Sequence, residues 1–180
     1  MTEAKRYVLL DRDGTIIKDK HYLSDPEGVE FEEGAVEGLK KLQGLGFGLV
    51  VVTNQSGVGR GYFSLEEAEA VNERMRRMLE AEGVHLAGIY TCPHAPEEGC
   101  ECRKPRPGLV YQAARELRFD PARMIVVGDK PADVALARAC GARGVLVLTG
   151  KGREANVDAG TEIVPDIGAL AERLAAEAAR

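Results

Sequence analysis

The chain has 180 residues, which suits a single domain over residues 1–180 with a core large enough to be stable without disulfide bonds. Its 24 Lys and Arg residues against 29 Asp and Glu residues give a formal net charge of −5, which argues against a protein that binds nucleic acid through bulk positive charge. No apolar run approaches the roughly 18 residues of a membrane span, and the first apolar run stops at Leu10, so we expect a cytoplasmic protein that binds no membrane.

Short apolar runs alternate with amphipathic stretches along the chain. The apolar runs predict strands at 7–10, 47–52, 89–91, 124–127 and 145–148, and the amphipathic stretches predict helices at 35–45, 65–81, 108–117, 132–139 and 168–179. Ser64 and Glu67 form a capping box before the second helix, and Gly46 and Gly83 lie where helices should end. The alternation predicts a three-layer α/β/α, Rossmann-like fold with a mostly parallel sheet.

Polar residues follow the first two predicted strands, where ligands of parallel sheets usually bind. Asp11 and Asp13 come directly after the first strand. Two carboxylates this close need a cation or hydrogen-bond donors to offset their repulsion, and oxygen ligands at this density suit Mg²⁺. The second strand is followed by TNQSG (53–57), whose hydroxyl and amide groups can hold phosphate oxygens. A solvated acidic turn and an ordinary polar turn are the alternatives for the two segments taken alone.

Two further polar segments follow later strands. Arg103 and Lys104 lie in a loop before a predicted helix, where they can be surface charges or can neutralise a phosphoryl group. Asp129 follows the fourth strand, and Asp133 lies one helical turn beyond it. In this order the four segments supply an acid pair, hydroxyl donors, a cation and another acid, which are the groups that phosphoryl transfer requires.

The loop after the third strand carries the pattern C-x-H-x5-C-x-C. Its ligand set is Cys92, His94, Cys100 and Cys102. Three thiolates and one imidazole form a closed tetrahedral zinc set with no open position, so we predict a structural Zn²⁺ rather than disulfides or a catalytic metal. This zinc loop, 92–102, immediately precedes Lys104, and we expect the metal to fix the segment that carries Arg103 and Lys104.

The ordered set of segments resembles the four motifs of the haloacid dehalogenase superfamily of aspartyl-phosphate phosphatases. The matching strings are DRDGT (11–15), TNQSG (53–57), RKP (103–105) and GDKPAD (128–133). The resemblance implies that Asp11 is the nucleophile, that Asp13 is the general acid and base, and that Thr53 and Lys104 hold the transferring phosphoryl group. It also implies a Mg²⁺ site formed by Asp11, the backbone carbonyl of Asp13, and Asp129.

Longer strings such as VVVTNQSGVGRG and CECRKPRPG are similar to a branch of this superfamily that acts on a phosphorylated sugar. The similarity implies substrate contacts from Asp19, Lys20, His21, Tyr22, Asn54, Gln55, Ser56, Arg103 and Lys130. Arg60 lies on a glycine-flanked loop, where it can reach a second phosphate or remain solvated. The site should have at most a minimal cap, because both possible insertion points are short.

Three alternatives remain at this stage. The short spacing between His94 and Cys100 is closer to that of related phosphatases whose substrate is a phosphorylated amino alcohol. A phosphorylated receiver-type signalling module also uses an acid pair and a lysine, although a zinc loop would be unusual there. An inactive, zinc-stabilised binding domain is the third. No long apolar stripe is left after the predicted helices are assigned to the sheet, so we expect a monomer.

Overall fold

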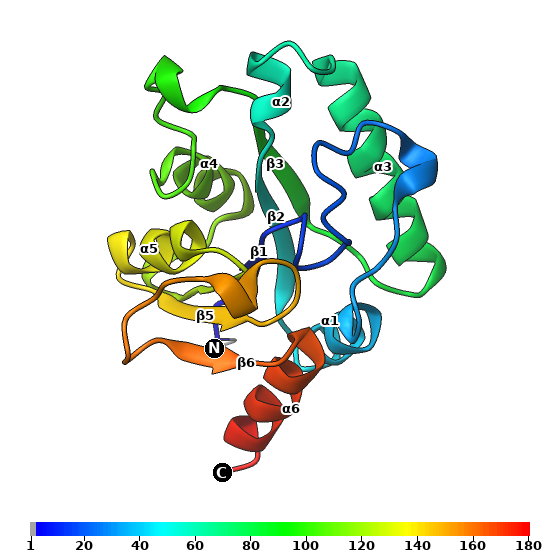
Figure 1. The fold of residues 1–180 in the computed structure, drawn as a ribbon. Helices are drawn as coiled ribbons and strands as arrows, with labels where there is room; N and C mark the ends of the chain where they lie inside the picture. Colours follow the sequence, from blue (N-terminus) through cyan, green and yellow to red (C-terminus); the bar gives the residue numbers. More distant parts are fainter. Residues whose placement is uncertain (1–2) are drawn as a thin grey trace.

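A single six-stranded parallel sheet organises the molecule, whose structure is a computed structural model that describes residues 3–180 (Figure 1). The strands are β1 (Tyr7–Leu10), β2 (Gly48–Asn54), β3 (Gly88–Cys92), β4 (Ile125–Gly128), β5 (Arg143–Val147) and β6 (Glu162–Val164), in the spatial order β3-β2-β1-β4-β5-β6. Every neighbouring pair runs parallel. The chain therefore reverses its direction of travel across the sheet beside β1, which is where ligands of such folds bind.

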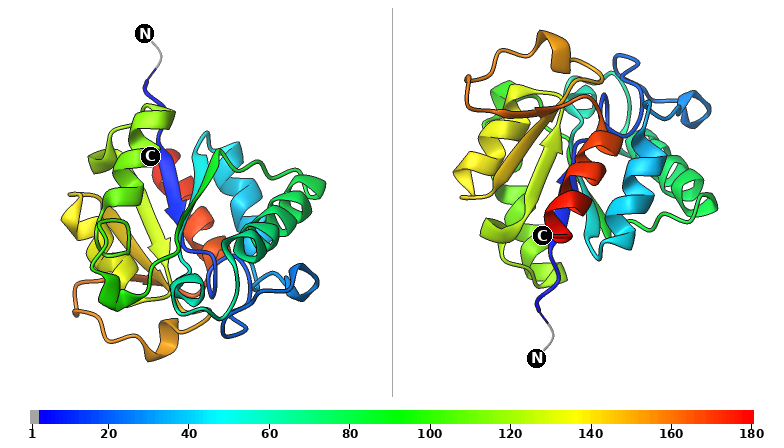
Figure 2. Two further views of the ribbon diagram at one scale, coloured as in Figure 1. Left: turned by 90° about the horizontal axis from the view of Figure 1, so that it is seen from above. Right: turned by 90° about the horizontal axis from the view of Figure 1, so that it is seen from below.

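Helices cover both faces of the sheet (Figure 2). The helices are α1 (Ala35–Gly44), α2 (Ser56–Gly59), α3 (Leu65–Ala81), α4 (Gly108–Leu117), α5 (Pro131–Ala139) and α6 (Ile167–Ala178). The side chains of α1, α3 and α6 pack on one face, and those of α4 and α5 pack on the other. All residues of β1 and β4 are buried, because a parallel strand covered on both faces must be apolar throughout.

The register brings the ends of the three central strands to one edge of the sheet. Leu10 pairs with Val51 on one side and with Val127 on the other. The backbone N–H of Asp11 continues this ladder and donates to the carbonyl of Val127 at 3.0 Å. Residues 11–13, 53–55 and 129–130 therefore meet at the carboxyl edge, as the sequence predicts.

The predicted three-layer fold is confirmed, but one strand and one α-helix were not predicted. The helices 65–81 and 108–117 have the predicted bounds, and the capping box of Ser64 and Glu67 is formed, with N–H···O distances of 2.9 and 3.1 Å. The strand β6 was not predicted, since it has only three residues and only Val164 is buried. The helix α2 is a single turn in a segment that we expected to be a loop. No helix among residues 3–180 is long and apolar enough to cross a membrane.

Candidate active site

Asp11 lies at the centre of the site, between two lysine side chains. Its side chain is 6% exposed, and it accepts hydrogen bonds from Lys104 Nζ to Oδ1 and from Lys130 Nζ to Oδ2, both at 2.9 Å. Burial alone would raise the pKa of Asp11, but the two ammonium groups outweigh it and hold that pKa below its usual range. Asp11 is therefore an ionised carboxylate, as a nucleophile must be.

Three oxygens of the site surround one cation. Lys130 Nζ lies 2.9 Å from Asp11 Oδ2, 2.9 Å from Asp129 Oδ1 and 3.0 Å from the backbone carbonyl of Asp13. These are the same three groups that the resemblance implies for Mg²⁺. Two carboxylates and a carbonyl are ligands that suit this ion. The position of the ammonium shows where these three oxygens can together bind a cation. The residues present therefore fit a magnesium site.

The loops carrying these oxygens approach one another closely around Asp129. Gly14 has φ of +87°, and a Cβ at this position would lie 2.1 Å from Asp129 Oδ2. The remaining donors to Asp129 are Thr15 Oγ1 at 3.3 Å and the backbone N–H of Lys151 at 2.9 Å. Burial and the nearby charge of Asp11 raise the pKa of Asp129 to about 7. The ammonium of Lys130 relieves part of this repulsion, and a divalent cation at the same point would relieve more.

Asp133 holds Lys104 in place. Lys104 Nζ donates to Asp133 Oδ1 at 2.8 Å, and the backbone N–H of Lys130 donates to Asp133 Oδ2 at 3.2 Å. Burial raises the pKa of Asp133, and Asp11 adds to this effect, whereas Asp11 and Asp133 together outweigh burial and raise the pKa of Lys104. Oxygens of Asp133, Asp11 and Asp129 lie within 4.8 Å of one another, but both oxygens of Asp133 already have donors.

Thr53, Asn54 and Gln55 come from the end of β2 and contact the residues around Asp11. Gln55 Nε2 donates to Asp13 Oδ2 and to Thr53 Oγ1, both at 2.8 Å. Asn54 uses both ends of its amide on the backbone of Lys104, accepting from its N–H at 3.0 Å and donating to its carbonyl at 3.2 Å. The β2 loop therefore fixes the position of Lys104 and joins it to Asp13.

The predicted substrate residues gather around a cavity of about 320 Å³, at the lower end of the size range of ligand pockets. Those that line it are Asp19, His21, Tyr22, Asn54, Gln55, Ser56, Arg103 and Lys130, together with Asp11, Asp13 and Lys104. Lys20 and Arg60 are not among the lining residues, and Lys20 Nζ contacts Glu30 at 2.7 Å instead. His21 and Tyr22 have φ of 55° and 65°, so two consecutive left-handed residues shape the rim.

Several residues of the site were missed by sequence reasoning. Arg12 is 1% exposed, and its guanidinium contacts Asp13 and Asn72. The position of Arg12 between the two acids was a visible signal, whereas Asn72 lies within an ordinary amphipathic helix. The ring of Tyr62 meets that of Tyr22 edge-on with centroids 4.8 Å apart, and nothing in the sequence pairs these two residues.

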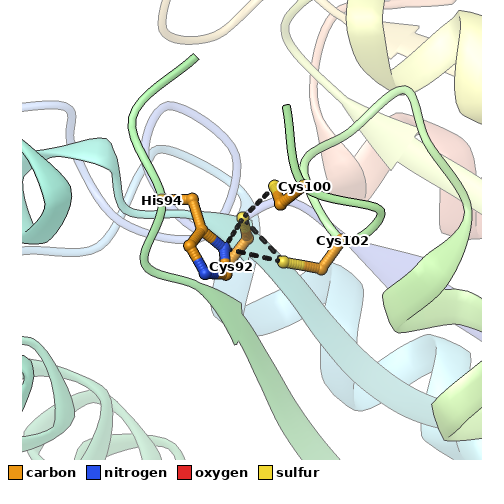
Figure 3. A group of neighbouring side chains, drawn as sticks. All are labelled: Cys92, His94, Cys100 and Cys102. Carbon is orange, nitrogen blue, oxygen red and sulfur yellow. Dashed lines mark hydrogen bonds between the residues drawn. The ribbon is translucent and has the colours of Figure 1, made fainter. Parts of the chain in front are cut away.

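The four predicted zinc ligands lie together (Figure 3), and the backbone of Cys92 is hydrogen-bonded to that of Gln55 in the site. The Cys92 Sγ–Cys102 Sγ distance is 3.0 Å, the Cys92 Sγ–Cys100 Sγ distance is 3.6 Å, and His94 Nδ1 lies 3.2 Å from Cys102 Sγ. A tetrahedral Zn²⁺ with ordinary bond lengths separates its ligand atoms by about 3.5–3.8 Å, so a small outward movement admits the ion. All four side chains are therefore available to one metal.

Comparisons with known proteins agree with this geometry. A family model described as HAD-hydrolase-like matches residues 101–170. The crystal structure of D,D-heptose 1,7-bisphosphate phosphatase from B. bronchiseptica, complexed with magnesium and phosphate, superposes with a TM-score of 0.87 at 34% identity, covering 97% of this chain and 99% of that one. The protein is thus a phosphatase with the haloacid dehalogenase-like fold.

Curated relatives narrow the class. D-glycero-beta-D-manno-heptose-1,7-bisphosphate 7-phosphatase from Haemophilus ducreyi is 45% identical over 82% of this chain and 85% of its own length. A probable D-glycero-D-manno-heptose-1,7-bisphosphate 7-phosphatase from Thermoplasma acidophilum is 43% identical over 74% of this chain and 84% of its own length. The chain belongs to this family of heptose bisphosphate phosphatases.

Proposed function

We propose that the protein removes the 7-phosphate of D-glycero-D-manno-heptose 1,7-bisphosphate in a Mg²⁺-dependent reaction that passes through an aspartyl-phosphate on Asp11. The observation that carries the mechanism is the buried Asp11 carboxylate, held by two ammonium groups at 2.9 Å and facing a cavity. The two cations offset the repulsion between this anionic nucleophile and an anionic phosphate. The substrate is the one for which the relatives are named.

In the first half-reaction an oxygen of Asp11 forms a bond to phosphorus, and the bond between phosphorus and the sugar oxygen breaks. Asp13 gives its proton to the leaving sugar oxygen, so the sugar departs as a neutral alcohol. Thr53 and Lys104 hold the transferring group, and the contact between Lys104 and Asp133 keeps the ammonium aimed at it. In the second half-reaction Asp13 takes a proton from water, which attacks phosphorus and regenerates the Asp11 carboxylate.

Asp11, the carbonyl of Asp13, and Asp129 would hold the magnesium ion, which when bound neutralises charge on the phosphoryl oxygens. Lys130 occupies that point in the structure, and its side chain is 34% exposed. Once the three oxygens are taken, its ammonium is free to turn into the cavity that it lines. We therefore retain Lys130 as a substrate contact, together with Arg103 and the rim residues Asp19, His21 and Tyr22.

The cysteine and histidine cluster would hold a structural Zn²⁺. Cys102 lies two residues before Lys104, and the carbonyl of Cys92 accepts from the backbone N–H of Gln55 at 2.7 Å. The cluster is thus tied to both loops that carry active-site groups. Removing zinc with a chelator should lower activity by displacing Lys104, and re-adding Zn²⁺ should restore it. Full activity in protein shown by metal analysis to be free of zinc would refute this role.

The decisive experiment measures Mg²⁺-dependent phosphate release from both anomers of the heptose 1,7-bisphosphate, with Asp11→Asn as the control. It also measures release from histidinol phosphate, the phosphorylated amino alcohol on which the alternative class of related phosphatases acts. We expect kcat/KM for the heptose ester to be at least about a hundredfold higher, which corresponds to about 2.7 kcal/mol of transition-state discrimination. The opposite preference would replace the proposed substrate but keep the mechanism. Equal release by wild type and Asp11→Asn would refute the mechanism itself.

We also propose that the protein is a monomer that works in the cytoplasm. The large exposed apolar side chains are Tyr22, Leu45, Tyr62, Leu65, Tyr111 and Ile163. Tyr22 and Tyr62 contact each other at the rim of the site, whereas Leu65, Tyr111 and Ile163 lie on α3, α4 and β6, so these side chains do not favour one extended interface. Four free cysteines, three of them in the proposed zinc cluster, suit a reducing compartment. Light scattering coupled to gel filtration tests the first proposal, and a dimeric mass would refute it.

A further inference from the structure

A chain of hydrogen-bonded polar side chains, buried at its centre and half-buried at its two ends, runs from the third strand to the general acid. It links Thr91 on β3, Asn72 on α3, and Arg12 in the loop after β1 to the carboxylate of Asp13. Its first and last members are 78 residues apart in the sequence, by subtraction of their numbers. The mechanism above uses only Asp13, so the other three side chains have no role in it.

Arg12, which does not line the cavity, binds the Asp13 carboxylate. Its Nε donates to Asp13 Oδ2 at 3.1 Å and its Nη2 donates to Asp13 Oδ1 at 3.2 Å, so the planar guanidinium meets both oxygens. A third donor, Gln55 Nε2, reaches Oδ2 at 2.8 Å from the opposite loop. The Asp13 side chain nevertheless keeps 19% exposure and lines the cavity. A two-point contact of this kind fixes the orientation of a carboxylate as well as its position.

Asn72 in turn holds Arg12. Asn72 Oδ1 accepts from Arg12 Nη1 at 2.8 Å, and Asn72 Nδ2 donates to Thr91 Oγ1 at 3.1 Å. The amide thus has a guanidinium at one end and a hydroxyl oxygen at the other. The opposite orientation would turn its NH₂ group toward the guanidinium, so the two contacts select a single arrangement. Asn72 is 7% exposed and lies between apolar neighbours on the buried side of α3.

A purely stabilising role does not explain this chain of hydrogen-bonded side chains. A buried guanidinium carries a large desolvation penalty, and apolar residues of the same volume commonly give equal or greater stability. The α3 face that carries Asn72 is otherwise apolar, with Val71 and Met75 fully buried beside it. A polar network that is fully satisfied instead gives a unique geometry. The one end of this chain that reaches the cavity is Asp13.

We propose that Arg12, anchored by Asn72 and Thr91, is a positioning residue that holds the Asp13 carboxyl group where it can deliver a proton to the leaving oxygen. This proposal rests on the proposed function of Asp13. It predicts that loss of the anchor harms proton delivery and leaves phosphoryl binding by Thr53 and Lys104 intact. The defect should therefore depend on how much the leaving group needs a proton.

The test compares kcat/KM for the heptose bisphosphate with kcat/KM for p-nitrophenyl phosphate, because nitrophenolate leaves as a stable anion and needs little protonation. For both substrates kcat/KM reports the steps up to aspartyl-phosphate formation. Asp13→Asn shows the effect of losing the general acid altogether. We expect it to lower the ratio of kcat/KM for the heptose bisphosphate to kcat/KM for p-nitrophenyl phosphate by about a hundredfold or more. Asn72→Leu and Arg12→Lys should lower that ratio at least about tenfold, and Thr91→Val should lower it less.

Met75→Leu is the matched control, since it changes a buried residue of the same helix that has no part in the polar chain. We expect it to keep the wild-type ratio. Folded Asn72→Leu and Arg12→Lys proteins that both keep the wild-type ratio would overturn the positioning role. If Asn72→Leu does not fold, Arg12→Lys decides, because it keeps the charge and loses the two-point contact. An unchanged ratio in Asp13→Asn would instead refute the acid role within the proposed function, and the positioning role with it.

Discussion

Replacing Lys130 with methionine tests whether its ammonium occupies the magnesium position. Methionine keeps an unbranched, flexible side chain but removes the charge that lies among Asp11, Asp13 and Asp129 at 2.9–3.0 Å. In the wild-type protein this ammonium must leave before a metal can take its place. The variant has no such competitor, so it should bind Mg²⁺ more tightly in the absence of substrate.

The size of the effect follows from the contacts that are given up. Hydrogen bonds to charged groups contribute about 1.5–3 kcal/mol each in net terms, and Lys130 makes two with carboxylates. Its side chain is 34% exposed, so the displaced ammonium regains much of its hydration. We therefore expect a net cost of about 1–2 kcal/mol for displacing it, which is a five- to thirtyfold difference in Mg²⁺ affinity.

Isothermal titration of Mg²⁺ into substrate-free wild type and Lys130→Met measures this difference directly. Lys151→Met is the control for a general change in charge, because Lys151 also lines the cavity but contacts Asp129 only through its backbone N–H. We expect the control to stay within about twofold of wild type, since exposed charges are strongly screened. Equal or weaker binding by Lys130→Met would refute the view that this ammonium holds the metal position.

Three other predictions follow from single contacts. Burial and a 2.6 Å hydrogen bond to Glu116 raise the pKa of Tyr90 to about 12, so this residue should contribute stability below pH 10 that is lost as pH rises toward 12. Tyr90→Phe should remove that part of the pH dependence in chemical denaturation, and an unchanged profile would contradict it. Gly14→Ala places a Cβ 2.1 Å from Asp129 Oδ2, so we expect it to lower the free energy of unfolding by at least about 2 kcal/mol. Thermal denaturation measures this loss, and a melting curve like that of wild type would show that the loops relax around the new Cβ. Ser64→Ala should cost about 1 kcal/mol of unfolding free energy with kcat unchanged, and no loss would mean that the cap is dispensable.

The amino-acid sequence specified most of the fold because its strands are continuous apolar runs bounded by polar residues. The central strands are buried throughout, so composition alone indicates them. The strand β6 (Glu162–Val164) gave no such signal, because an edge strand of three residues needs only one buried side chain. Its place in the sheet comes from pairing with β5, which is a tertiary contact and leaves no local pattern.

Residues that face the cavity could be predicted from the sequence more fully than the residues that support them. The acids, hydroxyls and lysines that face the cavity follow strand ends, so their position in the chain indicated them. The residues behind them were hidden, since Asn72 occupies a helix position that an apolar residue could fill. The role of Lys130 was also only partly visible, because its contact with three oxygens depends on how two distant loops meet. Local spacing reveals groups that touch a ligand more readily than groups that support them.

The buried charged residues around Asp11 lower the stability of the folded protein, so replacing them could raise it. Asp11, Asp133 and Lys104 are all at most 6% exposed, and ionised groups in such surroundings are commonly less favourable than apolar ones of equal volume. Selection of variants for thermal stability alone would therefore favour replacing Lys104 and Asp133 together, and would give a more stable but inactive protein. Directed evolution of a more durable enzyme must keep catalysis under selection at every round, and should look for its gains in helix caps and surface loops.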